Sequence, residues 1–290
     1  MSRNIIEIMI SCIICSRKPD IPAQLRENIA STVGCEYEIV VIDNSKNEYS
    51  IFSAYNEGVR RAKGDILCFM HEDILYHTTD WGKKVTMYFD NKQIGLIGNV
   101  GTHLLPKTIS GWYHPMVYSG GCIQNTNGIR QLQIETSHMK KNGQNIIEVV
   151  AVDGMWFCAP AKLFTKIKFD QNTFSHFHCY DLDICMQIKE SGYKICVTNE
   201  IILEHNSYGN FDLQWYEDSR KFYEKWKDKL PLTSGLDITN EEINIRTDLV
   251  NQVMVWQNAY AQCNEELSKM RDSYAYRIGK IIVSFLKVFR

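Results

Sequence analysis

A short apolar run, Ile66–Met70, is followed directly by three polar residues, His71, Glu72 and Asp73. Such a run, preceded by Gly64, is typical of a strand that is buried on both faces of a sheet. In an open α/β sheet, ligands bind at the edge where the carboxyl ends of the strands emerge. A carboxylate at that edge can hold a divalent cation that also contacts phosphate oxygens. Taken alone, the three polar residues indicate only a solvated loop, so the rest of the chain must decide.

Two further strand-like runs precede this one. They cover residues 5–14 and 38–42, and they end at Ser16/Arg17 and at Asp43/Asn44. Helical patterns lie between the runs, at residues 24–32 and 50–63. Short apolar strands that alternate with helix-length segments predict βαβ units and a parallel sheet. Because the carboxyl ends of parallel strands meet at one edge, we expect the polar residues of all three strand ends to lie together.

This set of side chains suits a nucleotide. Asp43 can hydrogen-bond a base or a ribose, Arg17 can face a phosphate, and Asp73 can hold a metal ion. The sequence contains neither a G-x-G-x-x-G motif nor a Walker motif. A metal ion would therefore have to neutralise the phosphates.

Charge and cysteine content narrow the class of protein. The chain has 290 residues, of which 32 are basic and 34 acidic, with a formal net charge of −2. No nucleic-acid partner is expected from that balance. Most of the ten cysteines lie in apolar runs, and strand alternation places Cys12 and Cys15 of the one C-x-x-C on opposite faces. We interpret them as reduced core residues, which favours a cytoplasmic location.

Neither a signal peptide nor a membrane-spanning helix is expected. Glu7 interrupts the apolar N-terminal segment, and no small-residue cleavage site follows it. No run approaches the ~20 apolar residues that a spanning helix needs.

Further motifs follow in the second half of the chain. Between residues 102 and 148 the pattern loosens, which predicts an inserted hairpin or loop region, where acceptor contacts are often found. Val152-Asp153-Gly154 lies in an apolar run, and Tyr180-Asp181-Leu182-Asp183 begins a helical run that ends near Gly192. His205 closes a short segment before an aromatic-rich helix at residues 211–226.

The order of these motifs resembles the family 2 glycosyltransferases of the GT-A fold, in particular a bacterial subgroup related to a streptomycin-cluster protein. The matching pieces are Val41–Ser45, Asn56-x-Gly58 with Ala62-x-Gly64-Asp65, residues 71–73, Val152–Gly154, Tyr180–Asp183 with Gly192-Tyr193, and His205. Each piece is weak by itself, but the ordered set covers roughly residues 5–230. The resemblance implies a GT-A-type α/β fold: a mostly parallel nucleotide-binding sheet flanked by helices, with a C-terminal helical extension.

The resemblance also implies roles for individual residues. It assigns contacts with the nucleotide to Ser16, Arg17, Asp43, Asn44 and His71. Asp73 matches the last acid of the family's D-x-D metal motif, and His205 matches a later histidine that completes the metal site, with Mn²⁺ or Mg²⁺ as cofactor. Asp181 matches the acid that acts as general base, and Asp153 lies on the expected acceptor side.

Two positions depart from the family pattern. His71 stands where the family usually has Asp, which puts its contact with ribose or metal in question. Tyr180 stands where the family commonly has Glu, although the acid that follows it, Asp181, is present.

The function expected from these residues is metal-dependent, inverting transfer of a sugar from a nucleotide-diphosphate donor, with UDP favoured. The acceptor would be a hydroxyl of a glycan or a lipid-linked molecule. A nucleotidyltransferase is an alternative, but residues 15–22 offer only Arg17 and Lys18 for a triphosphate. A non-catalytic sugar-nucleotide binder or scaffold that works through its C-terminal helix is another, and His71 and Tyr180 keep it open.

Several of these polar residues also have structural interpretations. Asp183 at a helix start is expected to cap the helix and to favour its dipole. A lone His205 would more often be a structural histidine, and only its context favours a metal. The loop histidines His176 and His178 usually pack or contact substrate, and we assign His178 to the acceptor side.

The C-terminal region is predicted as a separate helical extension, residues 233–290, after a catalytic domain at residues 1–232. Apolar residues recur there with alternating spacings of four and three, at Leu249, Val253, Trp256, Tyr260, Cys263, Leu267, Met270 and Tyr274. This heptad pattern over residues 249–274 favours a homo-oligomer, with docking onto the catalytic domain as the alternative because Trp and Tyr are bulky for a dimer seam. Residues 275–290 form a basic amphipathic pattern that suits the surface of an anionic membrane, with a continued coiled coil as the alternative.

Overall fold

The computed structural model describes residues 8–126, 128–135, 145–207, 209, 211–273 and 278–280. Its centre is a seven-stranded sheet with the strand order β10-β13-β5-β12-β3-β1-β2. The strands are β1 (Ile10–Ser16), β2 (Tyr37–Asp43), β3 (Ile66–Met70), β5 (Ile94–Gly98), β10 (Ile146–Val149), β12 (Trp156–Pro160) and β13 (Lys194–Thr198). Only β10 and β12 run antiparallel to their neighbours. The predicted mostly parallel sheet is therefore confirmed.

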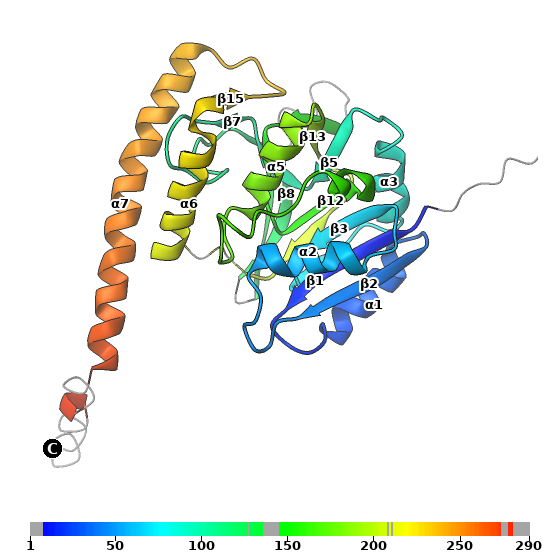
Figure 1. Ribbon diagram of the computed structural model, residues 1–290, viewed down its shortest axis with the longest axis horizontal. Helices are drawn as coiled ribbons and strands as arrows, with labels where there is room; N and C mark the ends of the chain where they lie inside the picture. Colours follow the sequence, from blue (N-terminus) through cyan, green and yellow to red (C-terminus); the bar gives the residue numbers. More distant parts are fainter. Residues whose placement is uncertain are drawn as a thin grey trace, which may run out of the picture.

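Helices cover both faces of this sheet (Figure 1). One face carries α1 (Ala23–Thr32) and α3 (Trp81–Tyr88), and the other carries α2 (Ile51–Arg61) and α5 (Tyr180–Glu190). All residues of β3 are buried, as expected for a continuous apolar run between two helical layers. The predicted boundaries of this strand are those observed, and the helices start within one residue of their predicted positions in α1 and α2.

A second sheet lies beside the first, with the order β11-β6-β8-β14-β4 and with β9 paired to β8. Its strands are β4 (Ile74–Tyr76), β6 (Val100–Thr102), β8 (Tyr118–Thr126), β9 (Ile129–Glu135), β11 (Ala151–Val152) and β14 (Leu203–His205). The antiparallel β8–β9 hairpin falls in the region where an insertion was predicted. The pairing of β14 with β4 places His205 opposite Ile74, next to the end of β3.

The remaining elements are short. The 3₁₀ helix η1 (Ala161–Thr165) follows β12, and η2 (Lys227–Lys229) follows the helix α6 (Leu213–Trp226). The strands β7 (Leu104–Leu105) and β15 (Leu232–Thr233) form a two-stranded sheet.

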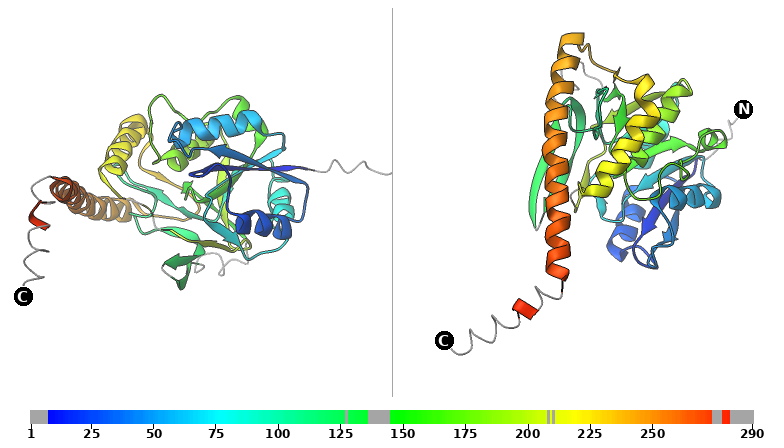
Figure 2. Two further views of the ribbon diagram at one scale, coloured as in Figure 1. Left: turned by 90° about the horizontal axis from the view of Figure 1, so that it is seen from below. Right: turned by 60° about the vertical axis from the view of Figure 1, so that its left-hand side comes forward.

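The last described element of any length is α7 (Asn240–Asp272), which begins where the side chain of Thr239 accepts a hydrogen bond from the Glu242 N–H. Figures 1 and 2 show α7 alongside α6 at the edge of the molecule, with its C-terminal end projecting beyond α6. None of the described helices combines the length and the apolar character needed to cross a membrane. Residues 5–7 of the first predicted strand, Tyr274 of the heptad pattern, and most of the amphipathic tail lie outside the described residues.

Candidate active site

The carboxyl ends of β1 and β3 are joined by Glu72. The Ser16 hydroxyl donates a hydrogen bond of 2.6 Å to one oxygen of Glu72, and the Arg17 N–H donates one of 3.3 Å to the other. No sequence pattern assigns Glu72 a role, because its partners Ser16 and Arg17 lie 56 and 55 residues away in the sequence. Glu72 thus fixes the strand edge, whereas the Arg17 side chain is exposed and forms no salt bridge within the described part of the chain.

The end of β2 lies beside that of β1, where Ser16 and Asp43 are register partners. The side chain of Asn44 is buried. Its amide NH₂ donates a hydrogen bond of 3.0 Å to the Tyr49 carbonyl, and its amide oxygen accepts one of 2.9 Å from the Tyr49 N–H. It therefore shapes the loop that follows β2. Asp43 is exposed, and a hydrogen bond from the Ser45 N–H lowers the pKa of its carboxyl. Of these two predicted nucleotide contacts, Asp43 is the one that faces solvent.

His71, Asp73 and His205 form a compact group. His71 Nδ1 lies 3.3 Å from His205 Nε2, and Asp73 Oδ1 lies 3.5 Å from His205 Nε2 and 3.9 Å from His71 Nδ1. One potential ligand atom from each residue lies within 4.8 Å of the other two. His71 and Asp73 follow β3, while His205 ends β14, so the group depends on the pairing of the two short strands β4 and β14.

Electrostatics ties the three residues together. Burial opposes protonation of His205, but the hydrogen bond and the negative charge of Asp73 outweigh it and raise the pKa of His205. Burial likewise opposes ionisation of Asp73, yet the hydrogen bond to His205 lowers its pKa overall. The pKa of His71 is lowered by burial and by the neighbouring His205. His71 is therefore the imidazole that is most readily neutral, the form that binds a metal.

The donor set of this group fits a divalent cation. Two imidazole nitrogens and a carboxylate oxygen converge from three backbone positions, and first-row transition metals accept both ligand types. Among the described residues, no other group of three histidine, cysteine, aspartate or glutamate side chains approaches this closely.

Tyr180 connects the metal-type group to the start of α5. Its phenol oxygen lies 2.8 Å from Nε2 of His71. Two backbone features hold it there. Cys179, directly before it, adopts a left-handed conformation with φ of 63°, which is uncommon for a residue with a side chain. Gly154 leaves the space that the tyrosine ring fills, because a Cβ at that position would overlap the hydroxyl.

Asp181 is the next residue along and is a carboxyl group with an unusual proton affinity. Burial and the negative charge of Asp153 raise its pKa to about 7, although hydrogen bonds from the backbone, including one of 2.9 Å from the Leu182 N–H, act in the opposite direction. A carboxylate with a pKa near neutral is suited to accept a proton during a reaction at neutral pH.

Asp153 lies on the loop that faces both Asp181 and the two histidines, since its charge affects the pKa of all three. It accepts a hydrogen bond of 2.9 Å from the Trp112 indole and one of 2.7 Å from the Met155 N–H. Sequence reasoning missed Trp112, which comes from the loosely patterned region at residues 102–148, where no periodicity marks individual side chains.

The other polar residues around α5 have structural partners. Asp183 is fully buried and accepts hydrogen bonds from Lys225 at 2.6 Å and from the Trp226 indole at 2.8 Å, so it anchors α6 as well as standing in the first turn of α5. His178 lies 3.8 Å from Asp212, and His176 lies 3.7 Å from Asp218. Because one histidine faces the N-cap Asp212 of α6 and the other faces Asp218 within that helix, they do not form a shared pair of ligands.

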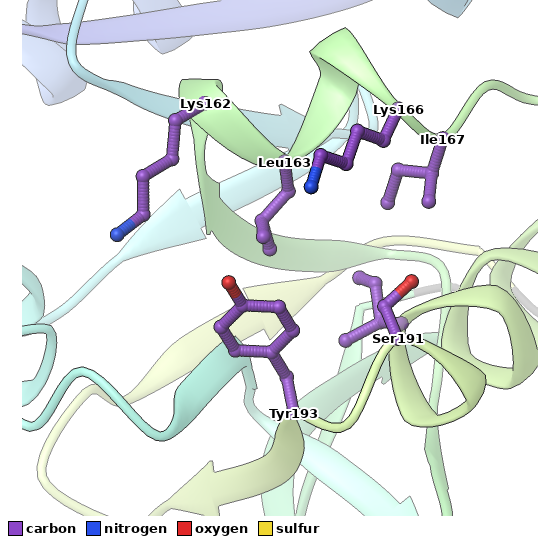
Figure 3. A pocket seen from close by; sticks show the side chains of 7 residues that line it. Lys162, Leu163, Lys166, Ile167, Ser191 and Tyr193 are labelled. Carbon is purple, nitrogen blue, oxygen red and sulfur yellow. The ribbon is translucent and has the colours of Figure 1, made fainter.

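A pocket of about 280 Å³ lies elsewhere, and its lining residues are Lys162, Leu163, Lys166, Ile167, Ile188, Ser191 and Tyr193 (Figure 3). It adjoins η1, which follows β12, and Pro160 at the end of β12 pairs with Ile66 at the start of β3. The pocket therefore lies towards the opposite edge of the sheet from His71. None of the predicted site residues lines it, and the negative end of the α5 dipole there offsets the two lysines.

The mixed sheet with its strand-edge site defines the class of protein. The same overall fold occurs in the crystal structure of GalNAc-T7 with UDP, GalNAc and Mn²⁺, with a TM-score of 0.53 and 11% sequence identity over 77% of this chain and 50% of that one. The crystal structure of S. aureus TarS residues 1–349 is similar, with a TM-score of 0.51 and 12% identity over 84% of this chain and 70% of that one. The chain thus spans about half the length of the first of these structures, and the likeness establishes the GT-A fold.

The family follows from the sequence. Residues 9–226 match the model of a family described as "Glycosyltransferase like family". Since the match covers most of the chain, this protein belongs to that glycosyltransferase-like family. No curated protein sequence matches the chain significantly.

Proposed function

We propose that this protein is a metal-dependent, inverting glycosyltransferase that uses a nucleoside diphosphate sugar, with UDP as the favoured nucleotide. The proposal depends mainly on one observation. A His71, Asp73 and His205 group suited to a metal is linked through Tyr180 to Asp181, a carboxyl whose pKa is about 7. The two halves of the proposed chemistry, a place for the diphosphate and a group that takes a proton, would thus be adjacent.

The donor would lie along the carboxyl edge of the main sheet. Asp43 would recognise the base, while Arg17 and the backbone around Ser16 would line the nucleotide pocket. This assignment is supported by the exposure of Asp43 and Arg17 and by the use of Glu72 to hold Ser16. A cation held by His71, Asp73 and His205 would supply positive charge to the departing diphosphate, and Mn²⁺ suits this mixture of imidazole and carboxylate ligands. Mn²⁺ is also present in the GalNAc-T7 structure.

Asp181 would act as the general base in a single displacement. The acceptor hydroxyl oxygen forms a bond to the anomeric carbon as the bond from that carbon to the diphosphate oxygen breaks. The hydroxyl proton passes to Asp181, and the nucleoside diphosphate leaves. One displacement inverts the anomeric configuration, and base catalysis of this kind contributes about 10²–10⁴-fold. The acceptor, a glycan or lipid-linked hydroxyl, would approach from the side of Asp153 and His178.

We also propose that residues 1–232 form the catalytic domain and residues 233–290 an appended helical extension. In support, the hydrophobic cluster that α7 forms with the described part of the chain contains α6 residues and Ile109 and none of the strand ends that carry the site.

Calorimetry of UDP binding, with and without Mn²⁺, tests the donor and metal assignments. We expect binding to need Mn²⁺ and to weaken strongly in Asp73→Asn. Asp90→Asn is the matched control, because Asp90 is an exposed acid just after α3 whose side chain has no salt bridge in the described residues. Tight binding that is indifferent to both Mn²⁺ and Asp73 would contradict the metal mechanism, and absence of UDP binding would remove the uridine assignment.

A further inference from the structure

The C-terminal helix α7 has two different apolar faces. One is used within the chain: Val250 and Met254 are buried in a cluster with Trp215 of α6. Polar contacts extend this face, since Gln257 hydrogen-bonds His114 at 2.9 Å and Arg246 donates to the Pro115 carbonyl at 2.8 Å. The docking of α7 onto its own chain is therefore accounted for by these residues.

The second face of α7 is exposed and follows the heptad pattern. We call it the α7 stripe, and it consists of Leu249, Val253, Trp256, Tyr260, Cys263, Leu267 and Met270. Trp256 is 77% exposed and Tyr260 is 68% exposed. Aromatic side chains bury a large apolar area at protein interfaces, so these two residues would gain the most from a partner that covers them. A contiguous apolar stripe of this kind on a protein surface marks an interaction site.

The position of the stripe argues that its partner lies outside this chain. The helix has 33 residues, which corresponds to about 50 Å at 1.5 Å per residue. Figures 1 and 2 show that the C-terminal part of α7 projects past α6. Leu267 and Met270, in the last turns of α7, are 42% and 61% exposed.

The charged residues beside the stripe favour a second copy of α7 as its partner, in parallel orientation. With Leu249, Trp256, Cys263 and Met270 at heptad position d, Glu266 occupies position g and Arg271 position e. In a parallel, in-register coiled coil, a residue at position g faces the residue at position e that lies five positions further along the partner helix. Glu266 of each copy would therefore face Arg271 of the other copy. Neither residue forms a salt bridge within the described chain. In an antiparallel pair centred on Tyr260, both charges would instead face uncharged positions near residues 250 and 252.

We infer that the α7 stripe pairs with the same stripe of a second copy of this chain, forming a parallel, in-register, two-stranded coiled coil. The result is a twofold-symmetric homodimer in which each catalytic domain stays docked to its own α7 through Val250 and Gln257 at position e and Met254 at position b. This inference is independent of the proposed enzymatic activity.

Sedimentation of the full-length protein in reducing buffer tests the dimer. We expect a dimer at micromolar concentration and a monomer for Trp256→Glu/Leu267→Glu. The matched control is Val255→Glu, because Val255 is 69% exposed but lies outside the stripe, and this variant should stay dimeric. A wild-type protein that is monomeric up to about 100 μM, or a dimer that persists in Trp256→Glu/Leu267→Glu, would overturn the proposal. Unchanged circular dichroism of the variants verifies that they are folded.

Two further variants test the orientation. Glu266→Arg should raise the dimer dissociation constant by about 2- to 5-fold per lost pair, and adding Arg271→Glu should restore it. Cys263, an exposed thiol, would face its own copy in the parallel register. Mild oxidation should then produce a covalent dimer in the wild type and none in Cys263→Ser, since a disulfide needs Cα atoms about 4.4–6.8 Å apart. A dimer that resists cross-linking through Cys263 would exclude the in-register parallel arrangement.

Discussion

The phenol oxygen of Tyr180 lies 2.8 Å from Nε2 of His71, and the other ring nitrogen of His71 faces His205 and Asp73. The two residues that depart from the family pattern are thus in contact with each other. If Nε2 carries the proton and donates to the tyrosine, Nδ1 keeps its lone pair directed into the metal-type group. The two departures are therefore compatible, because Tyr180 can accept a hydrogen bond from His71 Nε2 and leave Nδ1 free to bind a metal.

Tyr180→Phe tests this relationship. Removal of the hydroxyl leaves the His71 ring without the contact that orients it, and such partners of metal ligands typically contribute about 10–100-fold to metal affinity or activity. We expect a loss of that size in Mn²⁺ affinity, measured by titration in the presence of UDP. Tyr193→Phe is the control, because Tyr193 lines the pocket near the opposite sheet edge. Equal Mn²⁺ affinity in Tyr180→Phe and wild type would show that the contact does not support the ligand.

Gly154→Ala tests the same contact from the opposite side. A Cβ at this position would overlap the Tyr180 hydroxyl and ring, and the backbone of Gly154 also hydrogen-bonds Asp181. We expect transferase activity to fall at least as far as in Tyr180→Phe, with the fold retained. Gly279→Ala serves as control, since no atom of the described residues lies within 4 Å of the added methyl group. If the activity of Gly154→Ala matched that of wild type, Tyr180 would not need its present position.

The main sheet could be predicted from the sequence because its strands are continuous apolar runs that end in polar residues. The boundaries of β3 were predicted as observed, and the convergence of Ser16, Asp43 and His71 at one edge followed from parallel pairing alone. These features depend on local pattern and on one general rule of sheet topology, and both can be read from a single sequence.

The closure of the site could not be predicted in the same way. His205 reaches Asp73 only because β4 and β14, each of three residues, pair across more than 120 positions of sequence, and so short a strand has no periodicity. The contact between Trp112 and Asp153 and the bracing by Glu72 are likewise long-range side-chain contacts. The resemblance to a known family placed His205 at the site, but no pattern in the residues identified Trp112 or Glu72.

For α7, the heptad pattern identified a real stripe but not the docking face. The helix contacts its own chain through Val250, Met254 and Gln257, which lie beside the heptad positions. This face is narrow. Its polar residues Gln257 and Arg246 hydrogen-bond His114 and the Pro115 carbonyl, which lie in a region of the sequence without helical or strand periodicity. The sequence therefore presented docking and oligomerisation as alternatives, whereas the helix docks with one face and leaves the heptad face exposed for the pairing that we propose.

The pH dependence of transfer should report the ionisation of Asp181. Its pKa is about 7, so the base form is lost as the pH falls below that value, and kcat/KM measured at saturating Mn²⁺ should fall with it. Asp153→Asn removes a negative charge that raises this pKa, so the midpoint of the profile should move to lower pH. Asn offers one acceptor oxygen in place of two, so it can keep only one of the hydrogen bonds from the Trp112 indole and the Met155 N–H. A midpoint that stays in place in Asp153→Asn would assign the titration to another group.

Asp183→Ala should destabilise the protein. The carboxylate is fully buried, and its loss leaves Lys225 without its 2.6 Å partner and the Trp226 indole without an acceptor. Removal of one member of a buried ion pair lowers the free energy of unfolding by about 3–5 kcal/mol. The second contact of Lys225, with Asp170 at 2.7 Å, would remain and would reduce this loss. Urea unfolding measures the change, with exposed Asp228→Ala as control. A loss below about 1 kcal/mol would mean that Asp183 does not anchor α6.

Asp181→Asn should have the opposite effect on stability while abolishing most activity. The folded-state pKa of Asp181 is raised from 3.8 to about 7, so the folded protein holds a proton there that the unfolded chain releases. The stabilisation that accompanies this proton is complete below pH 4 and is lost as the pH rises through 7. At pH 8 the ionised carboxylate therefore costs stability, and a neutral amide removes that cost. We expect Asp181→Asn to be more stable than wild type by about 2 kcal/mol at pH 8 and by almost nothing near pH 4. Urea unfolding at the two pH values measures the difference, and equal stabilities at pH 8 would show that Asp181 is not strained by its surroundings.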